Sequence, residues 1–63
     1  MKIKIHNYET NAARVIEYPG NMSLFVSVHY SAWGFYGVTK AGRDHYIITD
    51  KFTGEIIDEI MRG

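Results

Sequence analysis

The chain has 63 residues, of which 46% are hydrophobic and 22% are charged, and its formal net charge is zero. A chain of this length has a thin core, and we expect residues 1–63 to form a single small domain. The absence of Cys excludes disulfides, thiolate metal ligands and a Cys nucleophile. No apolar run approaches the roughly 18 residues that a transmembrane helix needs. We therefore expect a soluble, cytoplasmic protein without membrane contact.

Charge is distributed unevenly along the chain. Residues 1–43 carry five basic and two acidic side chains, whereas residues 44–63 carry two basic and five acidic ones. The two parts could attract each other within one fold, or between two molecules arranged head to tail. Because exposed ion pairs contribute little stability, the favoured interpretation is two solvated faces of different sign.

Turn signals divide the chain into segments of about 6 to 9 residues, a length that suits strands better than helices. Each signal combines Gly, Pro, Asn or Asp, the residue types that accept turn conformations. The four signals lie at residues 7–11, 19–21, 41–44 and 50–54.

The first half of the chain contains three predicted strands. Residues 2–6 alternate apolar and polar side chains, which predicts a half-buried strand, and residues 14–18 form a second candidate. The clearest predicted strand covers residues 23–30, because its side chains alternate and many of them are β-branched or aromatic. In that strand Phe25 would lie on the otherwise polar face and would be exposed.

The second half contains two further predicted strands and one ambiguous segment. Residues 33–40 form a strand that is bent by its internal glycines, and residues 45–49 form another. Residues 55–62 place apolar side chains at helical spacing, but the turn before them favours a returning strand. A short strand followed by a helical turn satisfies both signals.

These elements predict an all-β fold. Five or six short antiparallel strands would form a meander that curls into an open barrel or a single curved sheet, with a short C-terminal helical turn. An α+β fold with a C-terminal helix is the alternative. Nine aromatic residues would supply the buried area that so small a domain otherwise lacks.

The sequence offers no motif for catalysis or metal binding. The three histidines, His6, His29 and His45, are far apart and show no spacing that places two ligands on one helical face. No Gly-x-Ser-x-Gly motif occurs, and the side chains of Asp58 and Glu59 would point to opposite sides of a strand. We expect a protein that is not an enzyme and has no metal site, no cofactor and no small-molecule substrate, because a thin core leaves little room for a pocket.

Nucleic-acid binding is the second function that the sequence suggests. Residues 32–40 resemble in part the aromatic strand motif of RNA-recognition and cold-shock domains, which stacks bases on aromatic rings. The segment departs from that motif, since Trp33 replaces a basic residue and Tyr36 and Gly37 occur in reversed order. The zero net charge also argues against this function, because phosphate contacts supply most non-specific affinity. The candidate residues for binding a single strand are Trp33, Phe35, Tyr36, Lys2, Lys4, Lys40 and Arg43.

A protein-interaction module is the favoured function. A domain this small cannot bury nine aromatic residues completely, and exposed aromatic residues are enriched at protein interfaces. The candidates are Phe25, Tyr36 and Phe52, and an unpaired edge strand would add a second mode of recognition. The partner would be another protein or a second copy of the chain in a homodimer. A third alternative, suggested by size alone, is an accessory or inhibitory protein of a mobile element.

Overall fold

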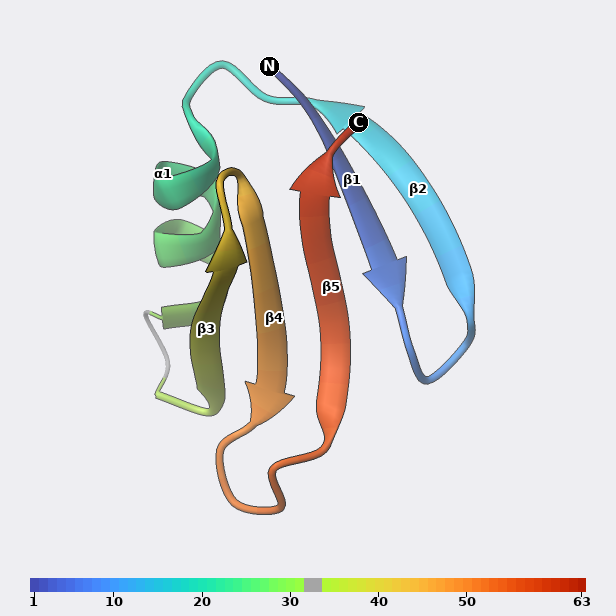
Figure 1. Ribbon diagram of the computed structural model, residues 1–63, viewed down its shortest axis with the longest axis vertical. Coiled ribbons are helices and arrows are strands. Elements are labelled where there is room, and N and C mark those ends of the chain that lie inside the picture. Colours follow the sequence, from blue (N-terminus) through green and yellow to red (C-terminus); the bar gives the residue numbers. More distant parts are fainter. Residues whose placement is uncertain (32–33) are drawn as a thin grey trace.

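A computed structural model describes residues 1–31 and 34–63 of the chain. It is mostly β, with five antiparallel strands in one sheet and a short helical segment packed on one side (Figure 1). The strands are β1 (Lys2–Asn7), β2 (Ala12–Glu17), β3 (Tyr36–Gly42), β4 (His45–Asp50) and β5 (Ile56–Arg62). The helical segment consists of α1 (Met22–Val26) and the π-helical η1 (Ser27–Ser31). The antiparallel, mainly β fold predicted from the sequence is therefore confirmed.

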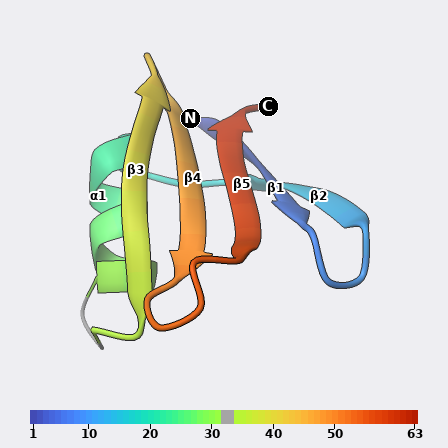
Figure 2. The same cartoon turned by 60° about the horizontal axis from the view of Figure 1, so that its bottom comes forward.

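The strand order across the sheet is β2-β1-β5-β4-β3. Three hairpins join neighbours in this order, and the segment that carries α1 and η1 connects one outer strand to the other. The sheet is strongly twisted, so that β1 and β2 run at an angle to the other strands (Figure 2). It does not close into a barrel within the described residues, because β2 and β3 each keep one unpaired edge.

The prediction of a strand at residues 23–30 is wrong, because the whole of this segment is helical. Asn21 caps the helix, and its side chain accepts a hydrogen bond from the backbone N–H of Leu24 at 2.8 Å. Apolar residues spaced three and four apart then face the sheet, and Met22, Phe25 and Val26 are all buried. The exposed position predicted for Phe25 is therefore also wrong, since its side chain is only 2% exposed.

The C-terminal helical turn is absent from the described residues, because β5 continues as a strand to Arg62. This strand lies between β1 and β4 and pairs with both. The other predicted strands are found with their ends shifted by up to three residues, and all four predicted turns connect elements.

The core lies between the helical segment and one face of the sheet. It consists of the buried residues Ile3, Ile5, Met22, Phe25, Val26, Ile48 and Ile60. Alternation along the strands sends the intervening side chains to the opposite face, which no described helix covers. We call this second surface the open face. No helix among the described residues has the length and apolar character needed to cross a membrane.

Candidate functional site

A cleft of about 720 Å³ opens at the end of the sheet where three connections meet. The β1–β2 turn, the start of β3 and the β4–β5 loop all contribute side chains to it. We call it the turn-end cleft. Its lining residues are Tyr8, Glu9, Phe35, Tyr36, Asp50, Glu55, Ile56 and Ile57. The cleft therefore combines five aromatic or β-branched side chains with three acidic side chains, and no described basic side chain lines it.

The β1–β2 turn positions Tyr8 and Glu9. The side-chain oxygen of Asn7 accepts hydrogen bonds from the backbone N–H groups of Glu9 and Thr10, both at 2.9 Å. This local turn is typical of Asn, and Asn11 completes it with a φ of 58°. The backbone N–H of Tyr8 also donates to the carbonyl of Ile57 at 2.8 Å, which fixes the turn against β5.

The β4–β5 loop is held in a similar way by Asp50. Its carboxylate accepts hydrogen bonds from the backbone N–H groups of Thr53 and Phe52, at 2.9 and 2.8 Å. These bonds favour the ionised carboxylate and lower the pKa of Asp50 from its ordinary value of 3.8. Gly54 adopts a φ of 78°, a left-handed conformation that suits Gly, and thereby returns the chain to β5. The loop that carries the acidic side of the cleft is thus ordered by its own sequence.

Large apolar side chains are exposed at this end of the molecule. Phe35 is 59% exposed, Ile56 is 46% exposed and Tyr8 is 44% exposed. Phe52, at the tip of the adjoining loop, is 81% exposed. The backbone N–H of Lys51 donates to the carbonyl of Phe35 at 3.2 Å, so the loop and the start of β3 are in direct contact.

The protein-binding candidates named from the sequence occupy three different environments. Phe25 is buried in the core, where its ring stacks on that of His29 with a centroid distance of 4.3 Å. Tyr36 is half-buried, packs edge-on against Tyr30 at 5.4 Å and lines the turn-end cleft. Phe52 is exposed beside the cleft. Two of the three candidates therefore lie at the same end of the sheet.

The nucleic-acid candidates that the structure describes do not form one surface. Lys2 and Lys4 lie on the open face of β1, because they alternate with the buried residues of that strand. Lys40 lies toward the end of β3 that leads into the turn containing Arg43, whereas Phe35 precedes the other end of that strand. Trp33 lies outside the described residues. No described basic side chain lies in the cleft with Phe35 and Tyr36.

A polar cluster on the open face was missed by the sequence analysis. The carboxylate of Glu59 accepts a hydrogen bond from Nε2 of His45 and another, at 3.0 Å, from the hydroxyl of Tyr8. These two hydrogen bonds lower the pKa of Glu59 from its ordinary value of 4.5. The cluster arises because β5 pairs with β1 and β4, and no local pattern in the sequence reveals that pairing. Among the described residues no group of three or more acidic or His side chains could hold a metal ion.

Comparison of the chain with family models, with curated proteins and with solved structures finds no match.

Proposed function

We propose that this protein is a non-catalytic protein-interaction module whose turn-end cleft binds a basic and apolar segment of a partner protein. The observation that carries the proposal is the composition of the cleft, in which Glu9, Asp50 and Glu55 surround exposed apolar side chains. We also propose that the protein acts in the cytoplasm, as its composition leads us to expect.

Charge complementarity indicates the partner. Three carboxylates around one cleft attract Lys and Arg side chains, and they repel nucleic acids and acidic peptides. Such attraction steers association and selects partners more than it adds affinity. The ordered turns hold the backbone of Glu9 and the carboxylate of Asp50 in place before binding, which reduces the entropy lost on association.

The apolar side chains supply the binding energy in this proposal. Phe35 and Ile56 are about half exposed, although a domain of this size has few apolar residues to spare from its core. Aromatic side chains at the centre of an interface contribute most when a partner excludes water from them. An apolar side chain of the partner, placed between its basic residues, would meet Phe35 and Ile56.

The residue types in the cleft support binding over catalysis. Its lining contains carboxylates, phenols and apolar groups, and it contains no described imidazole, aliphatic hydroxyl or amine. An acid–base reaction would need a titrating group near neutral pH, and hydrogen bonds lower the pKa of Asp50 away from that range.

An NMR titration with two matched peptides tests this function. The first peptide, of about 12 residues, alternates Arg with Leu and Phe, and the second replaces each Arg with Glu. We expect the basic peptide to bind with a dissociation constant of roughly 10–100 μM and to shift the amide signals of residues 8–9, 35–36 and 50–56. The acidic peptide should leave these signals in place. Equal binding of both peptides would contradict the role of the carboxylates.

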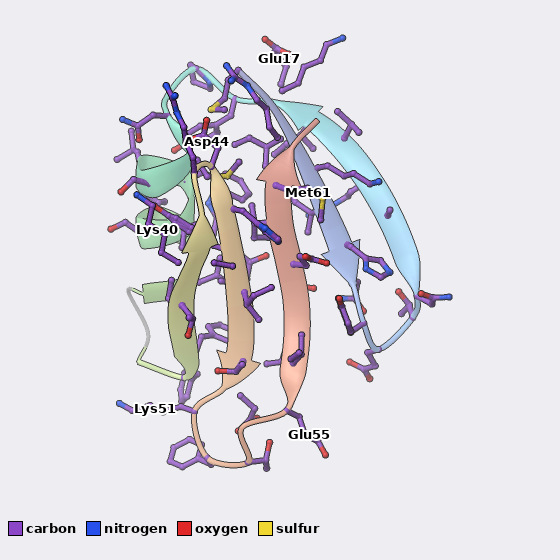
Figure 3. All side chains as sticks on the ribbon, in the orientation of Figure 1. Glu17, Lys40, Asp44, Lys51, Glu55 and Met61 are labelled. Atoms are coloured by element: carbon purple, nitrogen blue, oxygen red, sulfur yellow. The ribbon has the colours of Figure 1, made fainter. Side chains whose placement is uncertain are left out.

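Two pairs of variants locate the interaction. Phe35→Ala should weaken binding about tenfold, whereas Val15→Ala, which shortens an exposed side chain on β2, should not change it. The double variant Glu9→Gln/Glu55→Gln should weaken binding severalfold at low salt, and Glu17→Gln should not. Glu55 lies at the cleft end of the molecule and Glu17 at the opposite end (Figure 3).

Light scattering and an oligonucleotide titration separate the other functions. A concentration-dependent dimer whose interface shifts the cleft signals would identify a second copy of the chain as the occupant. Salt-sensitive shifts at Lys2, Lys4 and Lys40 with a single-stranded oligonucleotide would favour nucleic-acid binding. Either result would replace the proposed partner.

A further inference from the structure

Asp58 is a buried carboxylate in the central strand β5. Its side chain faces the core side of the sheet, two positions before the buried Ile60, and the residue is only 8% exposed. One carboxylate oxygen accepts a hydrogen bond from the hydroxyl of Tyr30 at 2.9 Å. The other, Oδ1, has no hydrogen-bond partner among the described residues. A buried carboxylate that lacks one of its partners is costly, and such a group calls for an explanation.

A second cavity, separate from the turn-end cleft, is lined by Asp58 and has a volume of about 300 Å³. Its lining residues lie on β1, the β1–β2 turn, β2, η1 and β5, and the two cavities share no lining residue. The small side chain of Ala12 on β2 lies on the same face of the sheet as Ile5 and leaves space there, and Tyr30 near the end of the helical segment also lines the cavity. At about 30 Å³ per water molecule, this volume corresponds to roughly ten waters.

Arg14 brings a positive charge to the same cavity. It is opposite Ile5 in the pairing of β1 with β2, so its side chain belongs to the core side of the sheet, yet the residue is exposed. Burial and the hydrogen bond to Asp58 raise the pKa of Tyr30, and the charge of Arg14 opposes that rise, which indicates that Arg14 lies near Tyr30. Arg14 forms no ion pair with Asp58 or with any other described residue. The cavity thus has two separated charges of opposite sign.

We propose that this cavity binds a small zwitterion of the α-amino-acid type, with its ammonium group toward Asp58 and its carboxylate toward Arg14. The ammonium group would donate to the carboxylate that lacks a partner. Arg14 would pair with the ligand carboxylate at the exposed side of the cavity. The apolar side chain of the ligand would contact Ile5, Ala12 and the ring of Tyr30.

The two charges together select this class of ligand. A simple cation would be attracted by Asp58 but repelled by Arg14. A simple anion would be attracted by Arg14 but repelled by Asp58. A neutral apolar compound would leave Asp58 without its missing partner. A zwitterion satisfies both charges, and its size suits a cavity of about 300 Å³.

An NMR titration with three probes of matched shape tests the assignment. Leucine carries both charges, leucinamide carries only the positive charge and 4-methylpentanoate carries only the negative charge. We expect leucine to shift the amide signals of Ile5, Ala12 and Ala13, and to bind at least about tenfold more tightly than either of the other probes. Binding of leucinamide as tight as that of leucine would overturn the zwitterion assignment. No shift by leucine up to about 20 mM would show that the cavity holds water only and would overturn the site itself.

Variants of the two charged residues provide a second test. Asp58→Asn keeps an oxygen that can accept from Tyr30 but removes the charge, and Arg14→Gln removes the other charge from an exposed position. Each should weaken leucine binding about tenfold, whereas Arg43→Gln, in the turn between β3 and β4, should leave it unchanged. If Asp58→Asn does not fold, Arg14→Gln and the three probes still test whether the cavity binds a zwitterion. Unchanged binding to Arg14→Gln would contradict the proposal. These probes do not depend on the peptide site, so this site and the turn-end cleft can succeed or fail separately.

Discussion

Asp58 and Glu59 are adjacent acidic residues with opposite surroundings. Because β5 is extended, Asp58 faces the core side and Glu59 faces the open side, as the sequence predicts for a strand. Their hydrogen-bond partners could not be predicted, since Tyr8 and Glu59 are 51 positions apart and meet only through the pairing of β1 with β5. The sequence thus indicates which face each carboxylate takes but not what it contacts there.

Glu59 makes the stability of the fold depend on pH. Its pKa is lower in the folded chain than its ordinary value of 4.5, because His45 and Tyr8 donate hydrogen bonds to the ionised form. A depressed pKa gives stability that is complete above the unfolded value and is lost as the pH falls through the folded value. We expect this contribution to be about 1 kcal/mol at pH 7 and to disappear at a pH below the folded pKa.

The comparison of Glu59→Gln with the parent chain measures this contribution. Urea unfolding should show a lower free energy of unfolding for Glu59→Gln at pH 7, and the two chains should converge in acid. Glu55→Gln is the matched control, since the Glu55 carboxylate accepts no hydrogen bond from a described residue. If the difference in free energy of unfolding between Glu59→Gln and the parent chain stays constant down to pH 3, the hydrogen bonds of Glu59 are not the cause of that difference.

At the level of elements, the segment from Met22 to Tyr30 supports two periodicities at once. A period of two groups Leu24, Val26 and Val28 and predicts a strand, whereas spacings of three and four group Met22 with Phe25 and Val26 and predict a helix. The helix forms, which leaves Leu24 and Val28 about half exposed and buries Phe25. Asn21 was the local signal that distinguishes the two, because Asn is a favoured N-cap and follows Pro19-Gly20.

The cap on α1 should contribute measurably to stability. Asn21→Ala removes the acceptor for the backbone N–H of Leu24 and should lower the free energy of unfolding by about 1 kcal/mol. Asn21→Ser keeps a side-chain oxygen at the same position and should lower the free energy of unfolding by only roughly 0.3 kcal/mol. Equal losses in the two variants, measured by urea unfolding, would mean that the cap bond is not the cause.

The C-terminal segment shows the opposite outcome. Ile56, Ile57, Ile60 and Met61 have helical spacing, yet they form a strand because β5 occupies the centre of the sheet. Partners on both sides satisfy its backbone groups, and Ile60 is fully buried. Long-range pairing decided this element, and a single sequence does not reveal it.

At the scale of the whole molecule, the strands and turns were largely predictable but their order was not. The meander expected from the sequence describes β3, β4 and β5, which are neighbours in the chain and in the sheet. The first hairpin instead joins the sheet through β1 and β5, the first and last strands of the chain. The turn-end cleft depends on this arrangement, because the β1–β2 turn reaches the β4–β5 loop only when β1 lies beside β5.

The same pairing brings the two ends of the chain together. The backbone N–H of Gly63 donates to the carbonyl of Lys2 at 3.0 Å, and both termini lie at one end of the sheet (Figure 1). A circular permutant that joins them with about five Gly and Ser residues and opens the chain at Pro19-Gly20 would have the connectivity α1-η1-β3-β4-β5-β1-β2. Every pair of adjacent strands would then be consecutive in sequence, and the contact order would fall. We expect the permutant to keep the same sheet and to refold severalfold faster in stopped-flow experiments, whereas slower refolding would show that the native connection across the sheet assists assembly.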